Sequence, residues 1–234
     1  YLVASKEDKE TMFLAYSELL NSLDSGATTK ITINNHKLNR NDFEKNILMP
    51  ERDDDLAVYR AEYNDMLREK AADANGIVQE KYITISVVKK DIEEARTYFS
   101  RVGSDLVAHF NALGSKCADM DAIERLRILH DFYRPGQEVY FRFDMTEMAK
   151  KGHDFKDYIC PDSIERFDDY VKLGDKFYRV LFIKDLAAYI KDSMVSELCE
   201  LNRNLMLSID ILPIPTDEAV REVENRLLGV ETNI

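Results

Sequence analysis

The sequence lacks any long apolar run. Its longest uninterrupted apolar stretches are Met12–Tyr16, Val180–Ile183 and Leu186–Ile190, whereas a helix that crosses a bilayer needs about 20 such residues. The first residues also lack the basic patch and apolar stretch of a signal peptide. We therefore expect no transmembrane segment.

Cysteine is scarce and widely spaced. The chain has three cysteines, an odd number, at positions Cys117, Cys160 and Cys199. They form no Cys-x-x-Cys pair and no Cys/His cluster with zinc-site spacing. This pattern favours three reduced thiols in a cytoplasmic protein over a disulfide framework.

Positive charge is also in short supply. Lys and Arg total 32 against 44 Asp and Glu, which gives a net charge of −12. Because nucleic-acid affinity comes largely from Lys and Arg that neutralise phosphates, this balance disfavours DNA binding by the chain as a whole, although a local basic patch stays possible. A length of 234 residues with 45% apolar residues allows one or two domains with a true core.

Nucleotide-binding loops are missing. A phosphate-binding loop needs Gly-x-x-x-x-Gly-Lys-Ser/Thr, but none of the eight glycines is followed by lysine, and no Gly-x-Gly-x-x-Gly occurs. Asp185 follows the apolar run Val180–Ile183 as a magnesium-holding aspartate does in such enzymes. Without a phosphate loop, a buried strand that runs into a polar turn is the better interpretation.

The histidines offer only weak catalytic candidates. The pairs His130-Asp131 and His153-Asp154 are adjacent in sequence. Adjacent side chains on a helix do not face each other, so we expect His130 and Asp131 to diverge. We interpret His130 as a half-buried helix residue and His153 as solvated, and the two remaining histidines, His36 and His109, lie far from both.

Two further candidates have structural explanations. Cys160 precedes Pro161 and has no assigned base, so a strand end is favoured over a nucleophile. The acidic cluster Glu51–Asp55 lies at an expected helix start, where negative charge stabilises the helix dipole, and it lacks calcium-loop spacing. We therefore assign no catalytic, cofactor-binding or metal-ligating residue, and the partner-binding residues stay unknown.

Hydrophobic periodicity predicts an α+β fold. Helices are expected after Ser5, after Pro50, over 91–113, 121–133 and 192–201, and from Thr216, with a short one over 42–49. Strands are expected over 1–4, 28–34, 77–88, 116–118, 139–143 and 205–211, and as a hairpin of 167–172 and 176–183 around Leu173-Gly174-Asp175.

This order suggests two subdomains. Residues 1–135 are expected to form a ferredoxin-like (split βαβ) subdomain with extra helices. Residues 136–158 are expected to be a connector, and residues 159–234 a second α+β subdomain built on a small mixed sheet with helices. We further expect both ends of the chain to be boundaries within a longer protein.

Several stretches give the sequence a recognisable likeness. It resembles the N-terminal region of the conjugal transfer ATPases of type IV secretion, the VirB/TrbE/CagE type in its Gram-positive conjugative-element form. The likeness spans essentially the whole chain, and the stretches that carry it are Val3–Glu10, Leu19–Gly26, Gly152–Asp162, Asp175–Asp185 and Asp217–Arg226. None of them is a catalytic motif.

The resemblance implies a non-catalytic docking and assembly domain. In that family the ATPase motor follows this region, so ATP and magnesium are expected only in a motor C-terminal to residue 234, and no nucleotide-site residue can be assigned here. The implied partners are inner-membrane components of the secretion channel and other ATPase subunits, with no direct DNA binding. The implied location is cytoplasmic, at the inner face of the cell membrane through protein partners.

Two alternatives stay open. The chain could be a free-standing protein-binding adaptor, which a phosphate loop beyond Ile234 would exclude. It could also be a metal-dependent enzyme that uses dispersed carboxylates and histidines. The enzyme hypothesis predicts stabilisation by a divalent metal of RT ln(1 + [L]/Kd).

Overall fold

The computed structural model describes residues 4–37, 43–44, 47–73, 77–185 and 193–231. The strand expected over 1–4 lies outside these residues except for residue 4. Of the short helix expected over 42–49, residues 43–44 are helical and residues 47–49 are not, and the other three lie outside the described residues. The helices are α1 (Lys6–Asn21), α3 (Ala57–Asp73), α4 (Ile92–Ala112), α5 (Ala122–Tyr133), the 3₁₀ helix η1 (Glu138–Tyr140), α6 (Met145–Lys151), α7 (Phe155–Ile159), α8 (Ser193–Cys199) and α9 (Thr216–Glu231). The strands are β1 (Ala27–Lys37), β2 (Ile77–Val87), β3 (Ile164–Arg166), β4 (Val171–Leu173), β5 (Lys176–Tyr178) and β6 (Leu205–Ile211).

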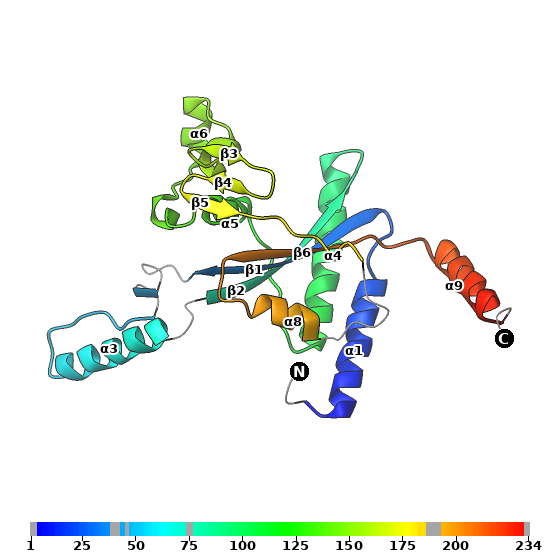
Figure 1. Ribbon diagram of the computed structural model, residues 1–234, viewed down its shortest axis with the longest axis horizontal. Helices are drawn as coiled ribbons and strands as arrows, with labels where there is room; N and C mark the ends of the chain where they lie inside the picture. The colour runs from blue at the N-terminus through cyan, green and yellow to red at the C-terminus, as the bar shows by residue number, and fades with distance from the viewer. Residues whose placement is uncertain (1–3, 38–42, 45–46, 74–76, 186–192, 232–234) are drawn as a thin grey trace. The chain divides into compact units, whose positions relative to one another are not determined.

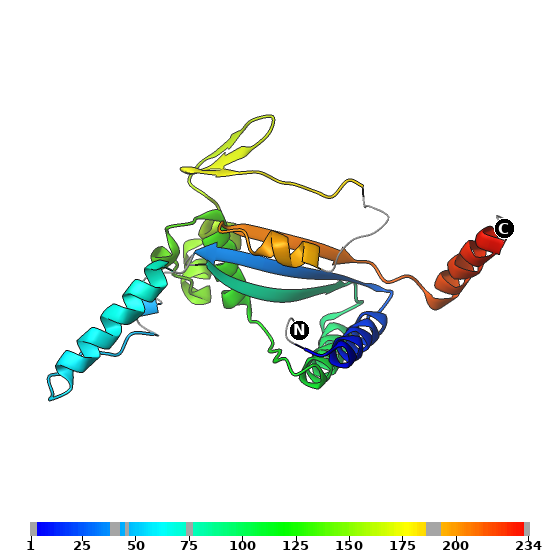
Figure 2. The ribbon, with the colours of Figure 1, turned by 60° about the horizontal axis from the view of Figure 1, so that its bottom comes forward.

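The expected α+β class is confirmed. One three-stranded sheet has the order β2-β1-β6, and a second has the order β3-β4-β5. Helices α1 and α4 lie side by side along one face of the first sheet (Figures 1 and 2). Its central strand β1 is buried on both faces from Thr32 to Asn35, as expected for a strand with neighbours on each side.

Local signals place the helix ends. Asp91 caps α4, since its side chain accepts a hydrogen bond from the backbone N–H of Glu94. Asp121 and Glu124 form a full capping box at the start of α5, and Ser5 caps α1. Each cap satisfies backbone donors that a helix start leaves without intrahelical partners. The sequence predictions for these helix starts are confirmed.

The second sheet contains the expected hairpin in a shortened form. β4 and β5 pair antiparallel, with Val171 opposite Tyr178, around a turn in which Gly174 has φ +60°. β3 also pairs antiparallel with β4, so this sheet is antiparallel rather than mixed. Val180–Ile183, which the sequence places in the second hairpin strand, lie beyond the end of β5 and belong to no strand.

Two expected strands are absent from the described residues, and the expected connector is largely helical. Residues 139–143 form the end of η1 and an irregular turn, and residues 116–118 have no regular structure. The apolar side chains of the first stretch pack on helices instead. Phe141 lies against His130 of α5, and Phe143 packs on Phe155 and Tyr158 of α7. Tertiary packing has overridden the alternating pattern in this stretch.

The chain divides into two compact units that interleave along the sequence. One comprises residues 1–33, 81–119 and 207–234, and the other comprises residues 34–80 and 120–206. The division falls within strands β1, β2 and β6. Both units are therefore discontinuous, which differs from the consecutive segments 1–135 and 159–234 expected from the sequence.

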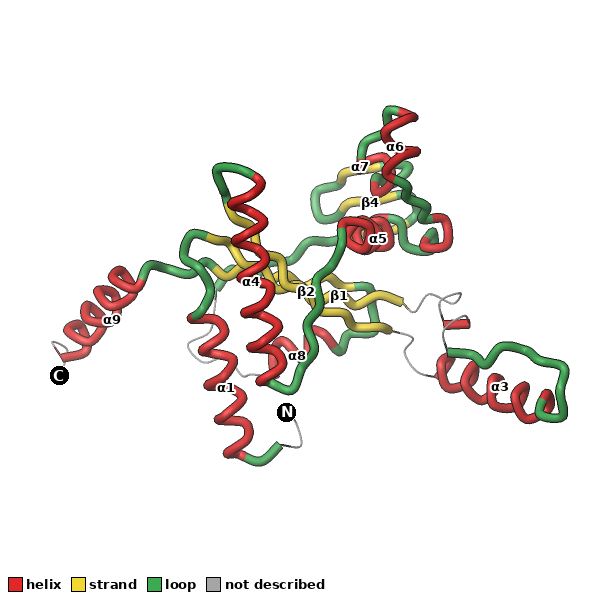
Figure 3. The backbone as a smooth tube through the Cα atoms, turned by 180° about the vertical axis from the view of Figure 1, so that it is seen from behind, coloured by secondary structure: helices red, strands yellow, loops and turns green. Residues whose placement is uncertain are grey.

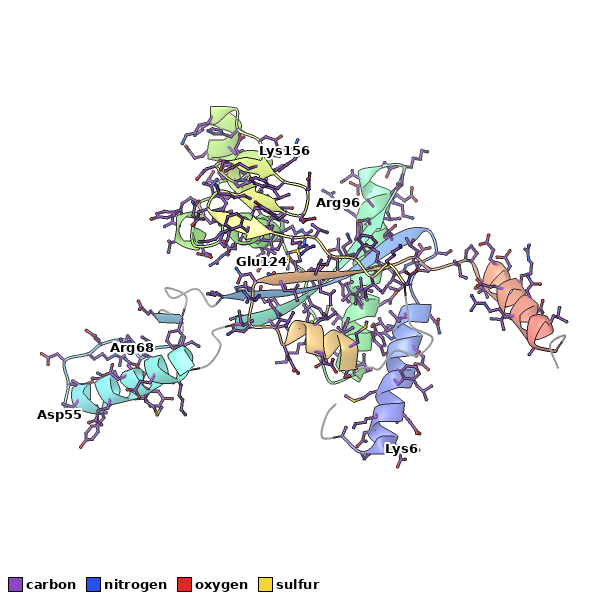
Figure 4. All side chains as sticks on the ribbon, in the orientation of Figure 1. Lys6, Asp55, Arg68, Arg96, Glu124 and Lys156 are labelled. Atoms are coloured by element: carbon purple, nitrogen blue, oxygen red, sulfur yellow. The ribbon has the colours of Figure 1, made fainter. Side chains whose placement is uncertain are left out.

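Charged side chains project from the helices throughout the chain (Figure 4). Lys6 pairs with Glu10 at 3.8 Å on α1, and Arg96 pairs with Glu93 at 3.0 Å on α4. Such exposed pairs stabilise a fold by at most about 1 kcal/mol each. Buried residues such as Leu19, Ile33 and Tyr98 therefore account for more of the stability than these surface charges do.

Candidate functional site

An open hollow lies beside α6 and α7. Its volume is about 540 Å³. Its lining has six charged or ionisable side chains and two aromatic ones, namely Arg142, Phe143, Asp144, Glu147, Lys151, His153, Asp157 and Tyr158. All eight come from residues 136–158, which the sequence suggested were a connector. This stretch is therefore folded and lines a hollow.

The histidine of the hollow has a carboxylate partner. His153 Nδ1 lies 3.2 Å from Asp157 Oδ2, one helical turn along the chain, rather than beside its sequence neighbour Asp154. The backbone N–H of Asp154 also donates to Asp157 Oδ2 at 2.9 Å. These contacts, the backbone hydrogen bond first, hold the pKa of Asp157 below its usual value. His153 is about half exposed, which agrees with the expectation that it is solvated.

The remaining charges of the hollow contact one another or the backbone. Lys151 Nζ lies 3.3 Å from Glu147 Oε2. The Asp144 carboxylate accepts from two backbone N–H groups and so caps α6, while Arg142 donates to the carbonyls of Val139 and Phe141. The lining contains no Ser, Thr or Cys, so the hollow supplies a His–Asp pair without an adjacent nucleophile. Its polar groups have structural explanations, and we assign it no reaction.

His130 departs from the sequence expectation. Its imidazole is almost fully buried, and its Nδ1 lies 2.8 Å from Asp131 Oδ1, so the two adjacent side chains meet rather than diverge. The ring also packs on Phe141. A buried imidazole needs a polar partner, and the neighbouring carboxylate supplies one. This pair belongs to the packing of α5.

His36 is the second histidine paired with a carboxylate. Its Nε2 lies 3.1 Å from Glu80 Oε2 on the neighbouring strand, and its Nδ1 lies 3.1 Å from the Lys37 carbonyl. The hydrogen bond with Glu80 raises the pKa of His36 above its usual value, against a smaller opposing effect of burial. The sequence did not predict this pair, because its members are 44 residues apart.

The other sequence candidates are held by structural contacts. All three cysteines are free thiols, with Cys160 exposed. Arg134 donates to the Cys160 carbonyl and to Asp162 Oδ1, so it fixes this loop to the end of α5. In the acidic cluster, Arg60 forms two 2.8 Å hydrogen bonds with the Asp54 carboxylate, which holds the pKa of Asp54 below its usual value. These contacts support the structural interpretations.

Within the described part of the chain, no group of three or more His, Cys, Asp or Glu side chains has the geometry to hold a metal ion. Asp185, the one aspartate that resembled a magnesium ligand, is exposed at the end of an irregular segment rather than at the end of a buried strand.

Large apolar side chains are widely exposed instead. In the segment after β5, the exposed fractions are 89% for Val180, 80% for Leu181, 82% for Phe182 and 56% for Ile183. On α9, the residues Val220, Val223 and Leu227 recur at helical spacing and are all half or more exposed. Contiguous apolar surface of this kind marks interaction sites. The interpretation of Val180–Ile183 as a buried strand is therefore wrong, because exposure depends on how the whole chain folds.

Comparison with known proteins gives no relative from which a role could be transferred. No protein-family model, curated protein or solved structure matches the chain. Among the described residues, none of the helices combines the length and apolar character required to cross a membrane.

Proposed function

We propose that this chain is a non-catalytic docking and assembly domain of a conjugal transfer ATPase. The sequence stretches named above resemble that family, and the domain would attach the ATPase motor to inner-membrane components of the secretion channel. ATP and magnesium would bind to the motor, and the location would be the inner face of the cell membrane, reached through protein partners.

The observation that carries the proposal is the exposed apolar face of α9. Val220, Val223 and Leu227 lie on one side of a helix whose other positions are largely charged. An amphipathic helix with an exposed apolar face is suited to a hydrophobic groove on a partner protein. The His–Asp pairs, by contrast, lie in places where packing and capping explain them.

The first experiment measures docking directly. The purified chain is mixed with the inner-membrane channel proteins of a conjugative element, and binding is followed by co-purification and by titration. Val223→Asp on α9 is expected to weaken binding at least about tenfold, because it places a charge in an apolar contact. Val88→Asp is the matched control, since Val88 is 95% exposed and follows a strand end. Equal binding by both variants would contradict the proposal for α9.

The second experiment addresses catalysis. The purified chain is expected neither to bind nor to hydrolyse ATP, because no glycine precedes a lysine in it. ATP turnover that survives further purification and follows the chain through each step would refute the non-catalytic role. A phosphate loop encoded beyond Ile234 would distinguish the motor-linked domain from a free-standing adaptor.

A further inference from the structure

The segment Arg179–Asp185, hereafter the 179–185 segment, follows β5 and has no regular secondary structure. It leaves the hairpin at the end of β5 and is neither helix nor strand through the described residues (Figure 2), and loops of this kind are drawn in green in Figure 3. All seven of its residues are exposed. The four central ones, Val-Leu-Phe-Ile, are consecutive apolar residues.

This composition favours a paired strand. Val, Phe and Ile are among the residues most enriched in β-strands. Because successive side chains in a strand point to opposite faces, four apolar residues in a row make both faces apolar. A segment of this kind, with unpaired backbone N–H and C=O groups, is a template for pairing with another chain.

The charges at the two ends of the segment identify the partner. In an antiparallel pair of identical segments centred on Phe182, residue numbers opposite each other sum to 364. Arg179 of one copy then lies opposite Asp185 of the other, and Leu181 lies opposite Ile183. Four residues share one face of the paired strand, namely Arg179, Leu181, Ile183 and Asp185. On this face the Leu181–Ile183 contacts therefore lie between two Arg179–Asp185 ion pairs, one at each end.

The opposite face is also compatible with this register. Phe182 meets its own copy at the two-fold axis, and Val180 lies opposite the aliphatic stem of Lys184. Aromatic pairs, aliphatic pairs and opposite charges are the cross-strand combinations that stabilise antiparallel sheets. A contact in which the same patch is used by both subunits is the commonest form of homodimer interface.

We propose that the 179–185 segment joins two copies of this chain by antiparallel strand pairing about Phe182. Within the described part of the chain, neither Arg179 nor Asp185 has a hydrogen-bond or ion-pair partner of its own, so both are available to the second copy. The inference rests on the assembly part of the proposed function and names the surface that it uses.

The nearby hairpin extends the apolar contact. Phe167 and Tyr170 stack with ring centroids 4.5 Å apart, and Phe177 packs edge-on against Tyr170 at 5.6 Å. Phe177 is itself well exposed on β5, the strand that leads directly into the segment. A paired second copy would therefore also pack against these aromatic rings beside the new strand.

The experiment is a charge exchange in the full chain, with sedimentation equilibrium as the measurement. Arg179→Asp alone places two carboxylates opposite each other at each end, and Asp185→Arg alone places two arginines opposite each other. Each single variant is expected to raise the dimer dissociation constant about tenfold or more. The double exchange restores the opposite charges and is expected to return the constant to within about threefold of the wild-type value.

Further variants and outcomes make the test decisive. Phe182→Asp is expected to abolish the dimer, and Val88→Asp, at an exposed position outside the segment, is expected to leave it unchanged. Hydrogen exchange at the amides of residues 180–184 is expected to slow as protein concentration rises. A chain that is monomeric at all concentrations, or a dimer whose single and double exchange variants behave alike, would overturn the inference. Because no channel protein is present, these outcomes are independent of the docking test on α9.

Discussion

The buried amide of Asn35 allows a quantitative test of the packing in its unit. Asn35 is 1% exposed, near the end of β1. Its Nδ2 donates to the Cys199 carbonyl at the end of α8, and its Oδ1 accepts from Gln79 Nε2 at 3.2 Å. One side chain thus links three segments that are far apart in sequence.

Replacement by alanine removes both hydrogen bonds and leaves a small cavity. Losing the partner of a buried polar group costs about 1–3 kcal/mol, so we expect Asn35→Ala to lower the free energy of unfolding by about 2 kcal/mol. For a chain of this length that corresponds to a fall in Tm of about 4–8 °C. Urea denaturation followed by far-ultraviolet circular dichroism measures the first quantity, and a thermal scan measures the second.

Asn35→Asp separates hydrogen bonding from size. The new carboxylate has nearly the shape of the amide but cannot donate to the Cys199 carbonyl, and burial disfavours its charge. Its pKa in the folded protein is then raised above the unfolded value. The added destabilisation is therefore expected to grow as the pH rises above about 4 and to shrink as the carboxyl becomes protonated.

Asn202→Asp is the matched control, since it makes the same chemical change at an exposed position. It is expected to change the free energy of unfolding by less than about 0.5 kcal/mol. If Asn35→Ala stays within about 0.5 kcal/mol of wild type, or if the two aspartate variants show the same pH dependence, the account of Asn35 as a buried linking group is refuted.

Three further predictions concern other local features. His36→Gln removes the charge that pairs with Glu80. Because the pKa of His36 is raised in the folded protein, the stabilisation by this pair is full below about pH 6.5 and is lost as the pH rises through the folded value. The difference in free energy of unfolding between variant and wild type, measured by urea titration, should therefore be larger at pH 5.5 than at pH 9. Asp121→Ala removes an N-cap and is expected to cost about 1 kcal/mol, with a loss of helical circular dichroism signal on gentle heating as a second readout. Gly174→Ala forces a β-carbon into the left-handed region at φ +60° and is expected to cost about 1–2 kcal/mol, whereas Gly103→Ala, inside α4, should be neutral or stabilising; similar effects from both glycine variants would contradict this reasoning.

Local rules were enough to predict the long helices. The caps at Asp91 and Asp121 are formed within four residues, and Gly114 takes the positive φ that a helix end favours. The irregular stretch around Phe141 and Phe143 could not be predicted in this way. Its apolar alternation is satisfied by aromatic contacts with α5 and α7, which depend on segments up to 15 residues away.

The histidine–carboxylate pairs also differ in whether local spacing predicts them. The His153–Asp157 pair has the spacing of one helical turn, so the sequence contained the signal for it. The His36–Glu80 pair depends on the register of β1 against β2, and no short-range pattern encodes that register. The meeting of His130 with Asp131 depends on burial of the ring, which the sequence alone does not show.

The 179–185 segment combines a high β-propensity with exposure to solvent. Val-Leu-Phe-Ile was predicted as a strand because of its residue types, and the structure assigns it to no strand. The same residue types explain why its exposure is unfavourable. At roughly 25 cal/mol for each Å² of apolar surface removed from water, four such side chains would gain several kcal/mol on being covered. Among the described strands, β3, β4 and β5 pair with one another and end before this segment, so a strand of a second copy is the cover that we propose. A second copy supplies that strand together with the Asp185 carboxylate that Arg179 lacks in the described chain, which is why assembly explains this segment better than any chemistry of its own.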